Sequence, residues 1–105
     1  MELKYQDTLD EFAAQVRKYY PYARIWAFGS RVHGNATWES DLDVCVVLEE
    51  ITPEDRTRIS DIAWEIGLLR DVVMTTIVFT RHQFEIGPLS VSPLVREIRG
   101  RGVAA

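Results

Sequence analysis

Two apolar segments of the chain are joined by the stretch Gly29-Ser30-Arg31-Val32-His33-Gly34-Asn35-Ala36-Thr37-Trp38-Glu39-Ser40-Asp41-Leu42-Asp43. The segment before it, from Arg24 to Phe28, predicts a short buried strand that stops at the glycine. The segment from Asp41 to Leu48 is rich in β-branched residues and predicts a second strand. Glycine and serine therefore follow the end of the first predicted strand, and two aspartates lie at the start of the second.

Two helices flank these strands. Apolar residues recur at helical spacing from Leu9 to Tyr20, and Asp7 or Thr8 is the expected N-cap. After the second strand, Thr52-Pro53 has the cap-then-proline pattern of a helix start, and this helix extends to Leu69. Its apolar stripe consists of Ile59, Ile62, Ala63, Ile66 and Leu69.

The remaining elements complete a small α/β domain. A third strand is expected at 72–80, and Ser92-Pro93 begins a last short helix that ends near Gly100. Helix 52–69 can join the second and third strands as a crossover on one face of the sheet. We expect one domain over residues 1–105, with about three strands.

Composition excludes several classes of function. The 105 residues include 16 acidic and 12 basic side chains, for a net charge of −4, which disfavours binding to duplex DNA. There is no apolar run long enough for a membrane span and no N-terminal secretory pattern. Cys45 is the one cysteine, which favours the reducing cytosol and excludes an internal disulfide.

Asp41 and Asp43 are candidate metal ligands. Residues two apart on a strand point to the same side, so both carboxylates can converge on one cation. Mg²⁺ suits such a pair, because it binds one or two carboxylates together with waters and substrate phosphates. The alternative is that both aspartates are a solvated start to the strand.

Gly29 and Ser30 are candidate phosphate-binding residues. A strand that ends in Gly-Ser can expose backbone N–H groups at the start of a short helix, and the serine hydroxyl adds a donor. A P-loop is unlikely, because Asn35-Ala36 replace the required Lys-Ser/Thr. The alternative here is a plain glycine turn.

The two features reinforce each other if the first two strands are antiparallel neighbours. The phosphate cradle then lies beside the aspartate pair, as phosphoryl or nucleotidyl transfer requires. Arg31 lies in the same loop, where it either contacts a phosphate or the acceptor or is a solvated arginine. Trp38 is a candidate to stack on a base or on a partner.

The stretch resembles the signature of the minimal nucleotidyltransferases, small members of the polymerase-β superfamily. This resemblance implies a mixed sheet of three to four strands with flanking helices, and ATP bound with Mg²⁺. It assigns Gly29, Ser30, Arg31 and Ser40 to the nucleotide, and Asp41 and Asp43 to catalysis and the metal.

The third strand departs from the family pattern. Active members carry a third acidic residue near the start of this strand, where it serves as metal ligand and general base. Here Thr75 or Thr76 stands at that place, and a threonine hydroxyl is a poor proton acceptor at neutral pH. Asp71, just before the strand, is the remaining candidate for the third acid, and its alternative role is to cap the turn after Arg70.

The resemblance leaves two functions open. One is transfer of AMP from ATP to a hydroxyl of a partner protein, as in antitoxins that silence a helical HEPN-domain ribonuclease toxin. The other is an antitoxin subunit that has lost catalysis and neutralises its partner by contact. The segment with Phe84, Ile86, Pro88 and Leu89 is either a partner surface or a loop folded over the sheet edge. A homodimer is left open.

Overall fold

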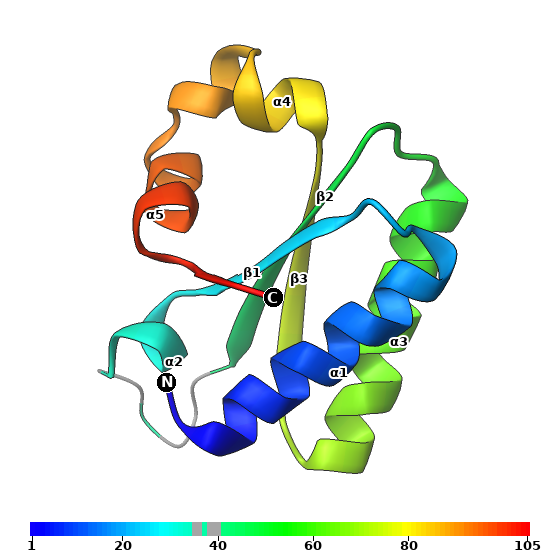
Figure 1. The fold of residues 1–105 in the computed structure, drawn as a ribbon, viewed down its shortest axis with the longest axis vertical. Coiled ribbons are helices and arrows are strands. Elements are labelled where there is room, and N and C mark those ends of the chain that lie inside the picture. Colours follow the sequence, from blue (N-terminus) through cyan, green and yellow to red (C-terminus); the bar gives the residue numbers. More distant parts are fainter. Residues whose placement is uncertain (35–36, 38–40) are drawn as a thin grey trace.

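The computed structural model describes residues 1–34, 37 and 41–105 (Figure 1). Its elements, in chain order, are α1 (Leu3–Tyr19), β1 (Arg24–Phe28), α2 (Ser30–His33), β2 (Leu42–Leu48), α3 (Pro53–Arg70), β3 (Met74–Thr80), α4 (Arg81–Glu85), the 3-10 helix η1 (Pro88–Val91), α5 (Pro93–Arg101) and β4 (Val103–Ala104). The four strands form one sheet in the order β3-β2-β1-β4.

The sheet is mixed, as the sequence predicts. β1 runs antiparallel to β2, with Phe28 paired to Asp43, and β4 runs antiparallel to β1. β2 and β3 are parallel and are joined by α3, which confirms the predicted crossover. Thr52 caps α3 through a reciprocal capping box with Asp55, and Pro53 occupies its first turn.

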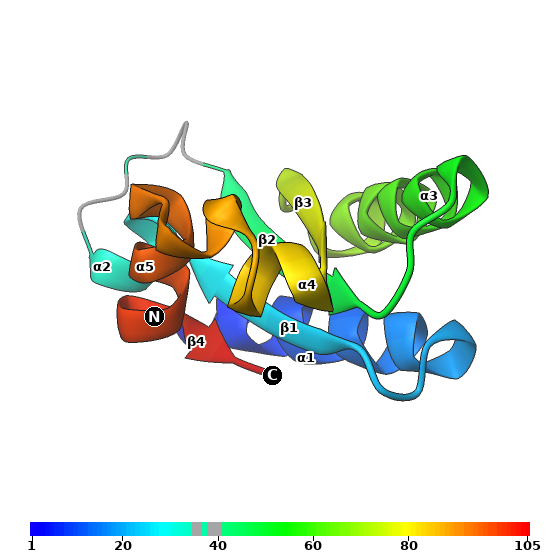
Figure 2. The same cartoon turned by 90° about the horizontal axis from the view of Figure 1, so that it is seen from above.

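α1 and α3 cover the first face of the sheet (Figure 2). Alternate residues of β2, namely Leu42, Val44 and Val46, point to this face and are fully buried. They belong to one apolar cluster with residues of both helices. Burial of a side chain of this size contributes roughly 1.5–3 kcal/mol to folding, so this layer fixes the register of β2.

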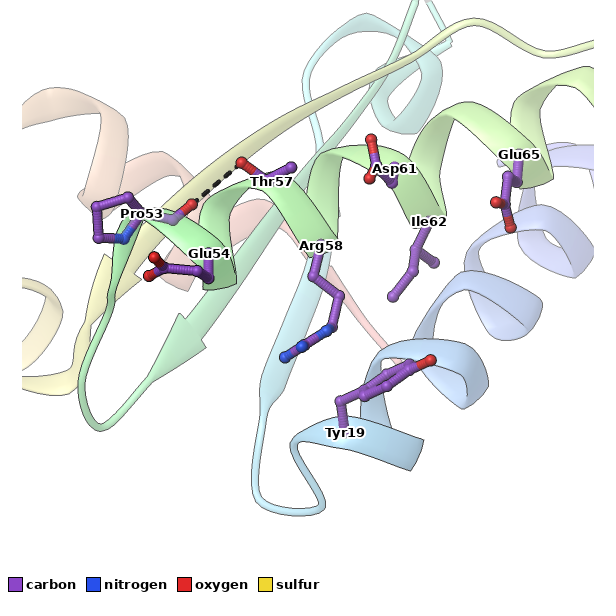
Figure 3. A pocket seen from close by; sticks show the side chains of 8 residues that line it. All are labelled: Tyr19, Pro53, Glu54, Thr57, Arg58, Asp61, Ile62 and Glu65. Carbon is purple, nitrogen blue, oxygen red and sulfur yellow. Dashed lines mark hydrogen bonds between the residues drawn. The ribbon is translucent and has the colours of Figure 1, made fainter.

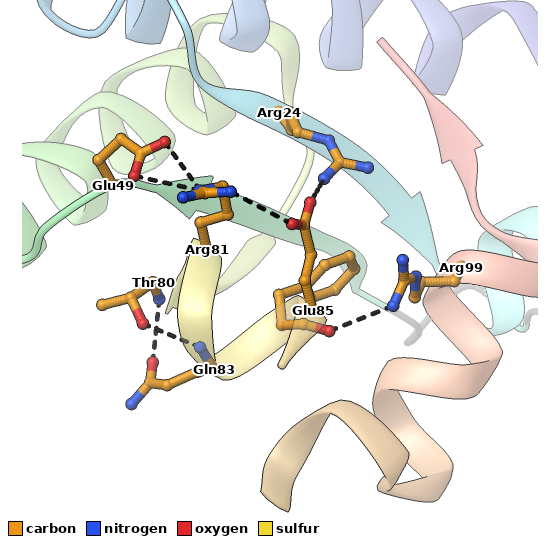
Figure 4. A network of polar contacts seen from close by, with 8 residues as sticks. Arg24, Glu49, Thr80, Arg81, Gln83, Glu85 and Arg99 are labelled. Atoms are coloured by element: carbon orange, nitrogen blue, oxygen red, sulfur yellow. Dashed lines mark hydrogen bonds and ion pairs between the residues drawn. The ribbon is translucent and has the colours of Figure 1, made fainter. Parts of the chain in front are cut away.

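α4 and α5 cover part of the second face. Cys45, Val47 and Phe79 of the sheet pack there against Phe84 of α4 and against two α5 residues, Val95 and Ile98. Ion pairs hold α4 in place: Arg81 bonds Glu49 at 3.0 Å, and Glu85 pairs with Arg24 (Figure 4). α4 contacts β2 and β3, whereas α5 contacts β1.

Four details differ from the sequence prediction. α1 begins at Leu3, several residues before the expected cap, and Thr8 is a buried mid-helix residue whose hydroxyl donates to the Lys4 carbonyl at 2.7 Å. Leu69 was expected in the core, but it is 78% exposed. The sequence analysis did not identify α4 or η1.

The fourth difference is the position of β4: a sheet of three to four strands was expected, but no strand was predicted at Val103–Ala104. No helix in the described part of the chain has the length and apolar content that crossing a bilayer requires.

Candidate functional site

The candidate site lies at the uncovered end of the second face, where three strands meet at Asp43. The register places Phe28 of β1 on one side of Asp43 and Thr75 of β3 on the other. Asp43 is half-buried and Thr75 is exposed. β1 and β2 are antiparallel neighbours, which is the condition that the sequence argument set, and Gly29 lies beside Asp43 at the start of β2.

Gly29 contacts the Asp43 carboxylate with its backbone. Its φ of 82° and ψ of −158° lie in a region that is nearly exclusive to glycine. A Cβ at this position would lie 2.5 Å from Oδ2 of Asp43, so no side chain fits between the turn and the carboxylate. The glycine therefore allows the main chain to approach the acidic side chain closely.

Thr75 contacts the same carboxylate from the other side. Its hydroxyl donates a hydrogen bond to Oδ1 of Asp43. Thr76 is the next residue along β3, so its side chain points to the opposite face. Of the two threonines that the sequence offered, Thr75 is the one that lies beside the aspartate.

Asp41 lies just before β2 and is half-buried, two residues from Asp43. Asp71 is the exposed C-cap residue of α3, with a left-handed φ of 54°, and the Lys4 ammonium bonds its carbonyl at 3.3 Å. Within residues 1–34, 37 and 41–105, no three histidine, cysteine or acidic side chains gather as a metal site. The structure thus does not bring Asp71 together with Asp41 and Asp43.

The turn after Gly29 forms α2. Ser30 is its first residue and is half-buried, and the guanidinium of Arg31 lies 4.4 Å from the ring centre of Tyr5 in α1. The Val32 and His33 N–H groups both donate to the Gly29 carbonyl, at 3.1 and 3.2 Å. Ser40 and Trp38, also predicted to contact the nucleotide or a partner, lie outside the described residues.

One contact of α2 was missed by the sequence analysis. Nε2 of His33 lies 3.2 Å from Oε1 of Glu97 in α5, and the histidine side chain is only 18% exposed. This pair joins the helix that carries Ser30 to the helix that covers the other half of the second face. The two residues are 64 positions apart, so no local sequence pattern could have indicated their contact.

A hollow of about 530 Å³ lies elsewhere, between α1 and α3 (Figure 3). Glu54, Asp61 and Glu65 line it, and Arg58 is the one cation among its lining residues. The Arg58 guanidinium lies 4.7 Å from the Tyr19 ring centre and donates to the Tyr20 hydroxyl. Three carboxylates against one cation that already has partners disfavour a triphosphate at this place.

Comparison with known proteins shows the family to which the chain belongs. The family model for the nucleotidyltransferase domain matches residues 9–101. The chain belongs to this family. It is also 41% identical over 56 residues to the probable protein adenylyltransferase MntA of Haemophilus influenzae. That match covers 47% of this chain and 49% of MntA, so it spans about half the length of the curated relative.

The donor set of this nucleotidyltransferase domain fits a single Mg²⁺. Asp41 and Asp43 offer hard carboxylate oxygens, and Mg²⁺ completes its shell with waters and phosphate oxygens. Asp43 gives one lone pair of Oδ1 to Thr75 and keeps others for a cation. The site has no third carboxylate among the described residues to take a proton from an acceptor.

Proposed function

We propose that this domain transfers AMP from ATP to a hydroxyl group of a partner protein, with Mg²⁺ as cofactor. The observation that carries the proposal is the placement of the Asp43 carboxylate between the Gly29 backbone and the Thr75 hydroxyl, at the open end of the sheet. Membership of the nucleotidyltransferase domain family supports the reaction type. The name of the partial relative, a probable protein adenylyltransferase, supports a protein as acceptor.

Each residue of the site has a distinct role in this proposal. The Gly29 backbone and Ser30 hold the triphosphate, with Arg31 and Ser40 as further nucleotide contacts. Asp41 and Asp43 hold the cation, which when bound neutralises charge on the phosphates and on the leaving pyrophosphate. Positioning of the phosphate beside the acceptor then supplies much of the rate enhancement, because this chemistry needs little covalent participation by the protein.

The partner we propose is a HEPN-domain ribonuclease toxin, which makes this protein the antitoxin of the pair. Ile86 and Leu89 are 65% and 46% exposed and offer an apolar contact near α4. Phe84, which the sequence analysis placed in the same surface, is fully buried in the second core cluster and cannot contribute. Modification of a side chain that the toxin needs would silence it.

A second candidate is an antitoxin that binds nucleotide but acts by contact alone. The occupation of the strand position beside Asp43 by Thr75 favours it, since the hydroxyl cannot replace a carboxylate as general base. In that case the partner is occluded without covalent change.

Intact-mass spectrometry separates the two candidates. The protein is incubated with ATP, Mg²⁺ and the helical partner, and the same is done with Asp43→Asn and, as a matched acidic control, Asp71→Asn. We expect an AMP-sized mass gain on the partner that Asp43→Asn abolishes and Asp71→Asn retains. An unmodified partner in a stable complex, with its ribonuclease activity lost, would instead establish neutralisation by contact.

A further inference from the structure

Thr75 is an exposed hydroxyl in direct contact with a carboxylate of the candidate site. It lies on β3, the edge strand of the sheet, on the face that α4 and α5 leave uncovered at this end. We propose that Thr75 is itself an acceptor, so that the domain attaches AMP to its own chain at this residue. This inference rests on the proposed function, because it uses the same nucleotide and the same site.

The register of the strands places this hydroxyl where an acceptor must be. Neighbouring strands lie about 4.8 Å apart, so Phe28, Asp43 and Thr75 form a row in which each is one strand from the next, and Gly29 directly follows Phe28. Gly29 and Ser30 would hold the outer phosphates of a nucleotide, and Asp43 would lie next to them. Thr75 then stands on the side of Asp43 away from Gly29.

The hydrogen bond to Asp43 prepares the hydroxyl for attack. Oδ1 of Asp43 accepts a hydrogen bond from the Thr75 hydroxyl in the resting structure, which is the contact that a general base makes with its nucleophile. Asp43 is otherwise held by the sheet register and by the close contact of its Oδ2 with the Gly29 turn. The pair is therefore positioned by the fold and needs no partner protein.

The step balances with ATP as the other reactant. The Thr75 oxygen forms a bond to the α-phosphorus, and the bond from that phosphorus to the oxygen bridging to the β-phosphorus breaks. Pyrophosphate leaves with the bonding electron pair, while the hydroxyl proton passes to Asp43 and from there to water. The product is a phosphodiester that links AMP to Thr75.

The modification would limit itself to one event per chain. The attached AMP remains at the site that bound it, and Thr75 loses the proton that it donated to Asp43. We therefore expect at most one AMP per chain, and we expect the modified chain to bind no further ATP. The adduct would thus be an inhibited form of the domain.

The test uses the chain alone with ATP and Mg²⁺, followed by intact-mass and fragment mass spectrometry. Thr75→Val keeps the side-chain shape but removes the hydroxyl, Thr75→Ser keeps the hydroxyl, and Thr76→Val alters the neighbouring threonine on the opposite face. We expect a single AMP-sized gain that maps to Thr75, is retained in Thr75→Ser and Thr76→Val, and falls at least tenfold in Thr75→Val. A gain that persists in Thr75→Val, or that maps to another residue, would overturn the inference.

A parallel titration with ATP and Mg²⁺ separates failure of this inference from failure of the proposed function. If the chain modifies its partner but gains no mass itself, the self-modification is wrong and the transferase stands. If it binds ATP but modifies neither itself nor its partner, the self-modification and the transfer are both wrong, and the nucleotide site stands. If it neither binds ATP nor gains mass, both are wrong.

Discussion

The second face of the sheet has a covered half, with Cys45 and Phe79, and an open half, with Asp43 and Thr75. Both halves belong to the same two strands, but their side chains differ in burial and in polarity. Asp43 and Cys45 are two residues apart on β2 and point to the same side, as do Thr75 and Phe79 on β3. Cys45 and Phe79 lie under α4 and α5 and are buried, whereas Asp43 and Thr75 lie beyond those helices. The position of the covering helices, more than the strands, decides which residues form core and which remain available to a ligand.

Electrostatics follow the same division. Burial raises the pKa of the Cys45 thiol from 9.0 to about 12, and the nearby Arg24 offsets only part of this effect. The thiol is therefore a packing group and not a nucleophile at neutral pH. Two residues earlier, Asp43 accepts a hydrogen bond from the Thr75 hydroxyl of β3, and the Gly29 turn lies close to its other carboxylate oxygen.

The largest change in stability should come from truncating Phe84, the α4 residue at the centre of the covered half. Phe84 is fully buried, and its ring stacks on Trp26 at 5.1 Å between centroids. Phe84→Ala should lower the free energy of unfolding by about 3–5 kcal/mol in urea denaturation. Thr75→Val in the open half should change it by no more than about 1 kcal/mol, and equal losses in the two variants would break the comparison.

The buried thiol should make the covered half sensitive to alkali. The unfolded thiol loses its proton near pH 9 and the folded one near pH 12, so the unfolded state binds fewer protons between these values. Relative to Cys45→Ala, the free energy of unfolding should be unaffected by the thiol below pH 9 and should fall by about 1.4 kcal/mol per pH unit up to pH 12. Parallel pH profiles for the two proteins would show that Cys45 is not held in its neutral form by burial.

The open half should respond to a single methyl group at the turn. Gly29→Ala places a Cβ against Oδ2 of Asp43 and forces a backbone conformation that costs alanine about 1–3 kcal/mol. Nucleotide binding should be lost as well, because Asp43 must move.

Gly34→Ala is the matched control for this variant. Gly34 also has a positive φ, of 79°, but no atom of the described residues lies within 4 Å of its Cβ position. Its substitution should cost stability through backbone strain and leave ATP binding within about threefold of the original. Equal loss of ATP binding in both variants would show that the contact with Asp43 is unimportant.

The smallest change in stability should come from weakening the contact between His33 of α2 and Glu97 of α5. Glu97→Gln weakens the pairing of α5 with His33, and because Glu97 is 39% exposed the stability change should stay below about 1 kcal/mol. We expect a few-fold weaker ATP affinity in calorimetry, since α2 carries Ser30 next to the site. An unchanged affinity would show that α2 needs no support from α5.

The parts of the fold that follow local patterns could be predicted from the sequence. The antiparallel pairing of the first two strands and the crossover by α3 both follow from residues close in sequence, such as Thr52-Pro53 and the apolar run after Asp43. The start of α1 was misplaced because Thr8 was interpreted as a cap, although its hydroxyl bonds within the helix to Lys4.

Other features depend on signals that were overlooked or on long-range contacts. The start of α4 has a readable capping box between Thr80 and Gln83, which the sequence analysis passed over. β4 is two residues long and is defined by its pairing with β1. A segment this short has no alternation of apolar and polar residues from which a strand could be predicted. The choice of Thr75 over Thr76 as the neighbour of Asp43 required the parallel register, which the sequence does not contain.

The central claim is that the open half of this face binds the nucleotide. Amide chemical shifts measured by NMR during titration with ATP, with and without Mg²⁺, test it most directly. We predict Mg²⁺-dependent shifts concentrated at Gly29, Ser30, Val44 and Thr75, and their loss in Asp43→Asn. Shifts concentrated instead at Tyr19 and Arg58 beside the α1–α3 hollow, or unchanged shifts in Asp43→Asn, would contradict the account.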